Sequence, residues 1–144
     1  IEEAFLAYKT ERYNIKGKDV VAGNCKYYLN DLSFKNFLYP GFAYGVGYLL
    51  ENAVYLELRR LGYIVYTGSF RDKEVDFVAM KDDRVIYLQA TYMLETAQTM
   101  EREYAPLLTI GDNYEKYVVS MDEVQFPSNE GVRHIQAWNL KEIL

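Results

Sequence analysis

The chain has 144 residues, half of them hydrophobic and 26% charged, a composition typical of a globular chain with room for one compact domain. Its net charge of −5 disfavours a surface devoted to coating nucleic acid, although residues 1–40 hold six basic side chains against five acidic ones. One cysteine, Cys25, and one histidine, His134, exclude an internal disulfide and a zinc site built from Cys and His, and indicate a reducing, cytoplasmic compartment.

The N-terminal region is predicted to form a helix, a hairpin and a second short helix. Apolar side chains at positions 1, 4, 5 and 8 have helical spacing, and a Lys-Gly-Lys segment at 16–18 is typical of a hairpin turn. Asp31 is a good N-cap, and Pro40 with Gly41 breaks the pattern that follows it. The expected elements are a helix at 1–8, hairpin strands at 12–15 and 19–21, a strand at 26–29 and a helix at 31–38.

The clearest helix is predicted over residues 44–61, where apolar side chains recur every three or four positions and Gly62 suits the position after the last turn. Two carboxylates, Glu51 and Glu57, border its apolar stripe on opposite sides. Because an unpaired carboxylate beside a core is costly, we expect Glu57 to pair with a basic side chain.

The remaining residues alternate between strand patterns and one further helical pattern. The Lys-Asp-Asp-Arg segment at 81–84 favours antiparallel pairing of the strands on either side of it. The strands are expected at 63–67, 74–80, 85–92, 116–120 and 132–136, and the helix at 96–108. A helix, three strands, a helix and a strand in this order predict an α/β domain with a mixed sheet.

Five segments of the chain carry a resemblance to known proteins, and they lie at 13–18, 26–31, 51–58, 73–78 and 114–117. Together they resemble the C-terminal domain of unknown function attached to many prokaryotic AAA-type ATP-binding proteins. The spacing from Glu51 through Gly62 and Asp76 to Gln89 also resembles the core of the PD-(D/E)xK, or restriction-endonuclease-like, nucleases.

The resemblance implies a restriction-endonuclease-like core at 44–144, with residues 1–43 packed on it as a helix–hairpin extension. It also implies a partner, an AAA-type ATPase domain upstream in the same polypeptide, and the chain indeed begins without Met in the middle of a pattern. The chain has no Gly-x4-Gly-Lys-Ser/Thr segment, so no P-loop ATP site is expected in it. No apolar run reaches the roughly 18 residues of a membrane span, so no membrane contact is expected.

The resemblance also assigns site residues. Glu51 matches the helix Glu of the nuclease motif, Asp76 the metal-binding Asp and Gln89 the second acidic position, and these three would hold Mg²⁺ or Mn²⁺. Thr91 stands where active members carry Lys. Metal-dependent phosphodiester hydrolysis needs carboxylates to hold the ion and a cation to stabilise developing charge, so this motif is predicted to be degenerate.

Two lysines that flank the second predicted core strand, Lys73 and Lys81, are the candidates to replace the missing cation. A basic group near the N-terminus is either a solvated hairpin face or a surface that faces phosphate. Its members are Arg12, Lys16, Lys18 and Lys26.

Three functions follow, in order of preference. The first is an accessory domain of an AAA-type ATPase that contacts nucleic acid or protein through a degenerate nuclease-like core, without catalysis. The second is a Mg²⁺-dependent DNA endonuclease that uses Glu51, Asp76 and Gln89. The third is a domain for homo-oligomerisation or partner recognition, which the acidic charge and the 15 tyrosines favour. We expect the side chains of Glu51, Asp76 and Gln89 to converge, with Thr91 on the sheet face of Gln89.

Overall fold

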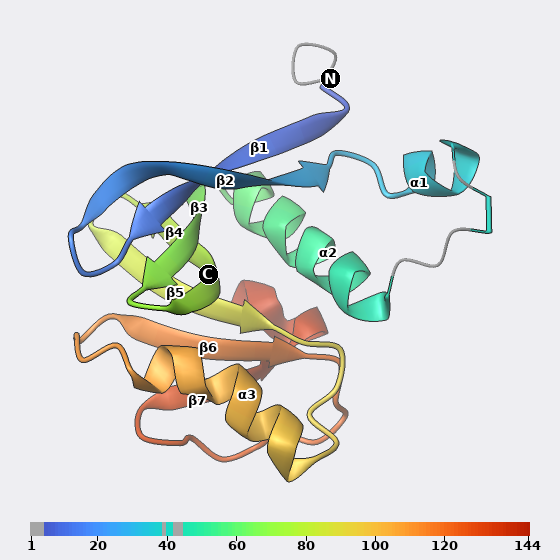
Figure 1. The fold of residues 1–144 in the computed structure, drawn as a ribbon. Coiled ribbons are helices and arrows are strands. Elements are labelled where there is room, and N and C mark those ends of the chain that lie inside the picture. Colours follow the sequence, from blue (N-terminus) through green and yellow to red (C-terminus); the bar gives the residue numbers. More distant parts are fainter. Residues whose placement is uncertain (1–4, 39, 42–44) are drawn as a thin grey trace.

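Seven strands form one mixed sheet in the order β2-β1-β3-β4-β5-β6-β7 in the computed structural model, which describes residues 5–38, 40–41 and 45–144 (Figure 1). The strands are β1 (Ala7–Asn14), β2 (Asp19–Leu29), β3 (Ile64–Phe70), β4 (Lys73–Lys81), β5 (Arg84–Ala90), β6 (Glu115–Ser120) and β7 (Val132–Gln136). The helices are α1 (Ser33–Leu38), α2 (Val46–Arg60), α3 (Ala97–Leu108) and the 3-10 helix η1 (Ala137–Glu142). The predicted α/β class with a mixed sheet is therefore confirmed.

The pairing of the strands makes the N-terminal hairpin part of the same sheet as the rest of the chain. β1 pairs antiparallel with β2 and parallel with β3. β4 pairs antiparallel with β5, as the segment at 81–84 predicts, and also with β3. β6 lies parallel between β5 and β7. The expected extension thus joins the core by backbone hydrogen bonds as well as by side-chain packing.

The two longer helices lie on opposite faces of the sheet (Figure 1). On one face the apolar stripe of α2, with Val54 and Leu58, packs against alternate residues of β4 and β5 such as Phe77. On the other face α3 packs through Tyr104 and Leu107 against the intervening strand residues. Because strand side chains alternate between faces, a central strand buried on both sides is apolar at nearly every position.

The predicted N-terminal helix is wrong in its described part. Residues 1–4 lie outside the described residues, but Ala7 and Tyr8 belong to β1, where Tyr8 pairs with Tyr28 of β2. Helical spacing over eight residues is a weak signal, and non-local pairing with β2 outweighs it at these positions. The expected separate strand at 26–29 is also part of one longer β2, whose register shifts between Thr10 and Arg12 of β1.

The other predicted elements agree with the structure within a few residues. Asp31 accepts the backbone N–H of Ser33 at 2.8 Å, and α1 begins at Ser33. Gly62 follows α2 with a φ of +88°, a conformation that favours glycine. α3 continues through Pro106 to its end at Leu108.

A β-bulge in β4 sets the position of the acidic residue in that strand. Tyr66 of β3 lies opposite Val78, whereas Gly68 lies opposite Val75, so two residues of β4 face one residue of β3. Asp76 lies in this bulge. Gly68 allows the close approach, since a Cβ there would come within 2.8 Å of a Val78 methyl carbon and 3.0 Å of the Val75 Cβ.

Candidate functional site

A lysine lies among three carboxylates where β2, α2 and β4 meet. The Nζ atom of Lys26 lies 2.9 Å from an oxygen of Glu51, 2.9 Å from an oxygen of Glu74 and 3.5 Å from Oδ1 of Asp76. β2 supplies the lysine, α2 supplies Glu51, and β4 supplies the other two carboxylates. We call these four residues the Lys26 cluster.

Further donors complete the hydrogen bonding of the Lys26 cluster. The hydroxyl of Tyr28 donates to Glu51 at 2.7 Å, and the guanidinium of Arg12 donates to Glu74 at 2.8 Å. The second oxygen of Asp76 accepts the backbone N–H of Ala90 at 2.9 Å. Each carboxylate of the cluster therefore has a second donor besides Lys26.

Burial and mutual attraction shift the pKa values of the cluster in opposite directions. Burial, reinforced by the nearby Glu51 carboxylate, raises the pKa of Asp76. Burial also opposes the charge of Lys26, but the carboxylates of Asp76 and Glu51 outweigh it, and the pKa of Lys26 is raised. For Glu74, burial opposes ionisation while Lys26 and Arg12 favour it, and its pKa is lowered. Lys26 is thus held as a cation.

The structure brings together Glu51 and Asp76 but separates Gln89 from them. The Gln89 Oε1 accepts the backbone N–H of Asp76 at 3.2 Å, and its Nε2 donates to Glu103 of α3 at 3.3 Å. Alternation along β5 explains this, because Gln89 shares a face with Tyr87, which packs on the α3 side. The expected convergence of three side chains is therefore reached by two of them.

The residues expected to supply or replace the missing lysine have other surroundings. Thr91 follows β5, is buried, and carries no charge. Lys81 donates to the backbone oxygen of Leu61 at 2.9 Å, at the opposite end of β4 from Asp76, and Lys73 forms no ion pair with a described residue. The cation that lies beside Glu51 and Asp76 is instead Lys26, which the sequence pattern groups with the basic residues of the N-terminal hairpin.

The carboxylates of the Lys26 cluster do not fit a divalent cation in this arrangement. Glu51 and Asp76 direct oxygens at an ammonium group, and the carbonyl of Gln89 is taken by a backbone N–H. Among residues 5–38, 40–41 and 45–144, no three His, Cys, Asp or Glu side chains are grouped as a metal site would require. The chemistry that the cluster supports is charge pairing within the protein.

A serine, a histidine and an aspartate also meet in the core, although no sequence signal links them. Ser120 lies 2.8 Å from Nε2 of His134 and donates to Asp122 at 2.6 Å. The backbone N–H of Phe126 donates to His134 Nδ1, so Nε2 carries the proton and donates to the serine. A nucleophilic serine needs a histidine that accepts its proton, so this buried group is structural. His134 is a buried residue with hydrogen-bond partners at both ring nitrogens.

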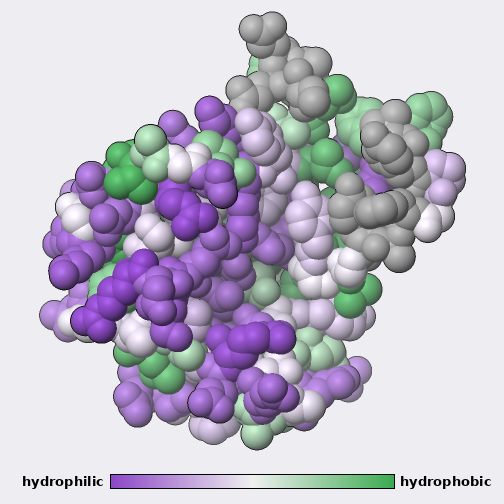
Figure 2. Space-filling model, viewed as in Figure 1, coloured by the Kyte–Doolittle hydropathy of each residue, from purple (hydrophilic) through white to green (hydrophobic). Residues whose placement is uncertain are grey.

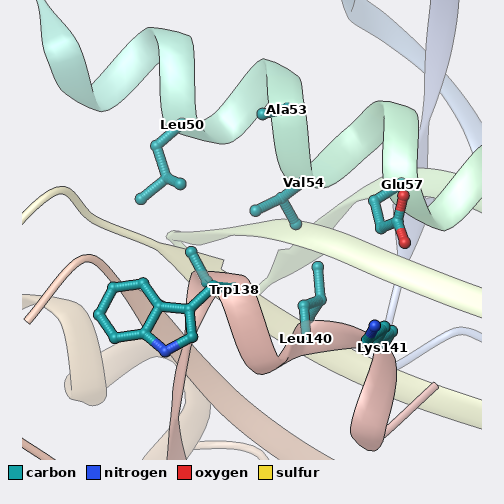
Figure 3. Close-up of a pocket in the computed structure, with 8 residues that line it drawn as sticks. Leu50, Ala53, Val54, Glu57, Trp138, Leu140 and Lys141 are labelled. Atoms are coloured by element: carbon teal, nitrogen blue, oxygen red, sulfur yellow. The ribbon is translucent and has the colours of Figure 1, made fainter. Parts of the chain in front are cut away.

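The predicted pairing of Glu57 is confirmed as well. Both of its oxygens accept hydrogen bonds from Arg60, at 2.7 and 2.8 Å, and these bonds lower the pKa of Glu57. Glu57 also borders a groove of about 300 Å³ between α2 and η1. Figure 3 shows Leu50 and Val54 of α2 facing Trp138 and Leu140 of η1 across it. The groove lies outside the Lys26 cluster.

Comparison with known proteins finds a relative of clear sequence similarity. A protein of Haemophilus influenzae, described as an uncharacterized protein, is 36% identical over 120 residues. The match covers 83% of this chain and 29% of the relative, so the chain spans less than a third of the relative's length. No family model and no solved structure matches the chain. No helix among the described residues is long and apolar enough to span a membrane.

Proposed function

We propose that this chain is a non-catalytic accessory domain of an AAA-type ATPase, with a restriction-endonuclease-like core that contacts nucleic acid without cutting it. The observation that supports the loss of catalysis is the position of Lys26, 2.9 Å from Glu51 and 3.5 Å from Asp76. In the nuclease motif these two carboxylates hold the divalent ion. Here an ammonium group of the protein itself pairs with both carboxylates.

Two further differences point the same way. At the motif's second acidic position Gln89 is a neutral amide that bonds the backbone of Asp76 and the side chain of Glu103, and hard cations prefer sites with more anionic oxygens. Thr91 supplies no positive charge at the position where the motif has lysine. Each change weakens metal binding or transition-state stabilisation independently of the other.

The link to an ATPase rests on the resemblance of five separate segments, and the length of the relative is consistent with it. In the Haemophilus influenzae protein the matched region is 29% of the chain, so the similar segment there is one part of a larger protein. A domain that lacks catalysis but contacts nucleic acid would position the attached ATPase on its substrate.

The test is to measure cleavage and binding in the same samples. The domain is incubated with end-labelled single- and double-stranded DNA in Mg²⁺ and in Mn²⁺, and we expect DNA binding with no cleavage above background. The variant Gln89→Glu with Thr91→Lys restores the motif's charges, but residue 89 faces α3, away from Glu51 and Asp76, so we expect this variant to show no cleavage either.

The endonuclease alternative predicts a different result. Metal-dependent cleavage by the unmodified domain, lost in a folded Asp76→Ala variant, would establish the endonuclease alternative. In that case Lys26 would be the cation that serves catalysis, and Lys26→Met would abolish cleavage as well. Self-association without any DNA binding would instead favour the oligomerisation alternative.

A further inference from the structure

We infer that the phosphate backbone of nucleic acid binds at one end of the sheet, on two adjacent turns that we call the basic turn pair. The first turn joins β1 to β2 and includes Lys16 and Lys18, and the second joins β3 to β4 and includes Arg71. Lys73, at the start of β4, adjoins the second turn. This inference deepens the proposed function, and it rests on that function, by naming the surface through which nucleic acid is held.

The sheet topology brings the two turns together from distant parts of the sequence. β1 and β3 run parallel, so both end at the same end of the sheet, and Asn14 pairs with Ser69. The backbone N–H of Ile15 extends this pairing by donating to the Ser69 oxygen at 2.9 Å. In Figure 1 the β1–β2 turn and the β3–β4 turn lie on the same side of the molecule. A surface shared by both turns follows from this pairing.

The cations of the basic turn pair are available to an external anion. Lys16, Lys18 and Arg71 are exposed and Lys73 is half-buried, and none forms an ion pair with a described residue. Figure 2, in the view of Figure 1, shows a mostly hydrophilic surface over this side of the molecule. The four cations outnumber the carboxylates of Asp19 and Asp72, and the next carboxylate, Glu74, is already paired with Arg12 and Lys26.

The structure also divides the four residues that the sequence grouped as phosphate-facing. Arg12 pairs with Glu74, and Lys26 pairs with Glu51 and Glu74, so both cations are already paired within the protein. Lys16 and Lys18 remain, and the second turn adds cations that the sequence placed more than 50 residues away. A local excess of positive charge in a chain of net charge −5 selects an anion at that one place.

The basic turn pair lies close to the Lys26 cluster. Lys73 precedes Asp76 by three residues on β4, a separation of about 10 Å along a strand. Because B-DNA advances about 3.4 Å per nucleotide, that separation corresponds to about three nucleotides.

The test compares two triple variants that each remove three positive charges. Lys16→Gln, Lys18→Asn and Arg71→Asn alter the turns, with Asn at the two positions of positive φ because it tolerates that conformation. Lys9→Gln, Arg60→Gln and Lys141→Gln alter exposed cations elsewhere. Circular dichroism establishes that both variants are folded. Fluorescence anisotropy with labelled single- and double-stranded DNA then gives the dissociation constant at several salt concentrations.

We expect the turn variant to bind DNA at least about 10-fold more weakly at about 0.1 M salt, and the slope of log K against log salt to fall by about 2. The dissociation constant of the control variant should change by less than about twofold. Equal losses in both variants, or no loss in the turn variant, would overturn the basic turn pair and leave the proposed nucleic-acid contact standing. A folded unmodified domain that binds neither DNA at low salt would overturn both.

Discussion

Lys26 is the residue on which the arrangement of the site depends, because three carboxylates of the protein share its charge. Its side chain is 30% exposed, whereas those of Glu51 and Asp76 are 17% and 10% exposed. Removing the ammonium group leaves carboxylates without their common partner in a poorly solvated place, and an unpaired buried charge costs more than a missing surface ion pair.

The variant Lys26→Met is therefore expected to lower the free energy of unfolding by about 1–3 kcal/mol. A matched control, Lys9→Met, removes an exposed lysine of the neighbouring strand and is expected to change it by less than about 0.5 kcal/mol. Urea titration measures both. In a double-mutant cycle with Glu51→Gln the two costs should be less than additive, since a neutral amide at that position needs no cation. Strict additivity would contradict the pairing.

Asp76 gives a prediction about pH. Burial and the Glu51 carboxylate raise its pKa from 3.8 to about 7, so between these values the folded protein holds a proton that the unfolded chain has lost. The contribution of Asp76 to the free energy of unfolding then falls as the pH rises from about 4 to about 7. The variant Asp76→Asn has no such titration. Between about pH 5 and about pH 8, the melting temperature of the unmodified protein should therefore fall by several degrees relative to that of the variant. Parallel curves would refute this.

The sequence predicts two of the three acids that meet at the site, Glu51 and Asp76, but not Glu74 and not the lysine that they face. Glu51 and Asp76 can be found from motif spacing, because a helix and a strand fix side-chain direction locally. Lys26 falls into a different group in the sequence, since only the folded sheet brings β2 over α2 and β4. The separation of Gln89 from Asp76 depends on a bulge in β4, and a bulge leaves no local pattern in the sequence.

At the scale of the elements, the sheet was predictable where apolar periodicity and turn residues agree, as in β3 to β5 and α2. It was not predictable at residues 7–8, where a helical spacing lies in a strand that pairs on both sides. Three tyrosines, Tyr28, Tyr87 and Tyr117, are fully buried on strands and belong to the core. Tyr28 also stacks on Tyr55 of α2, with ring centroids 4.2 Å apart.

The bulge in β4 leads to a prediction about the stability of the sheet. Gly68→Ala would bring a methyl group to 2.8 Å from a Val78 methyl carbon and 3.0 Å from the Val75 Cβ, so the strands must separate. We expect a loss of about 1–3 kcal/mol in the free energy of unfolding. Gly111→Ala is the control, because nothing lies within 4 Å of the position that its new methyl group would take. Equal stability of the two variants in urea titration would show that β3 and β4 do not approach so closely.

At the scale of the whole molecule, one sheet carries two charged regions of different character toward the same end. In the Lys26 cluster three carboxylates share one lysine of the protein, while the basic turn pair leaves its cations without an ion pair among the described residues. This separation of charge suits a domain that holds a phosphate backbone without hydrolysing it. The helices packed on both faces support β4 and β5 beneath the cluster.

We propose that Lys26 occupies the place that a divalent cation holds in the nuclease motif, and Mn²⁺-induced line broadening in NMR spectra tests this proposal. The reporter is the amide of Ala90, whose N–H donates to Asp76 at 2.9 Å. With Mn²⁺ up to about 1 mM, we expect this signal to remain sharp in the unmodified domain and to broaden in Lys26→Met, where the carboxylates lose their partner. Selective broadening of the Ala90 signal in the unmodified domain would contradict the claim.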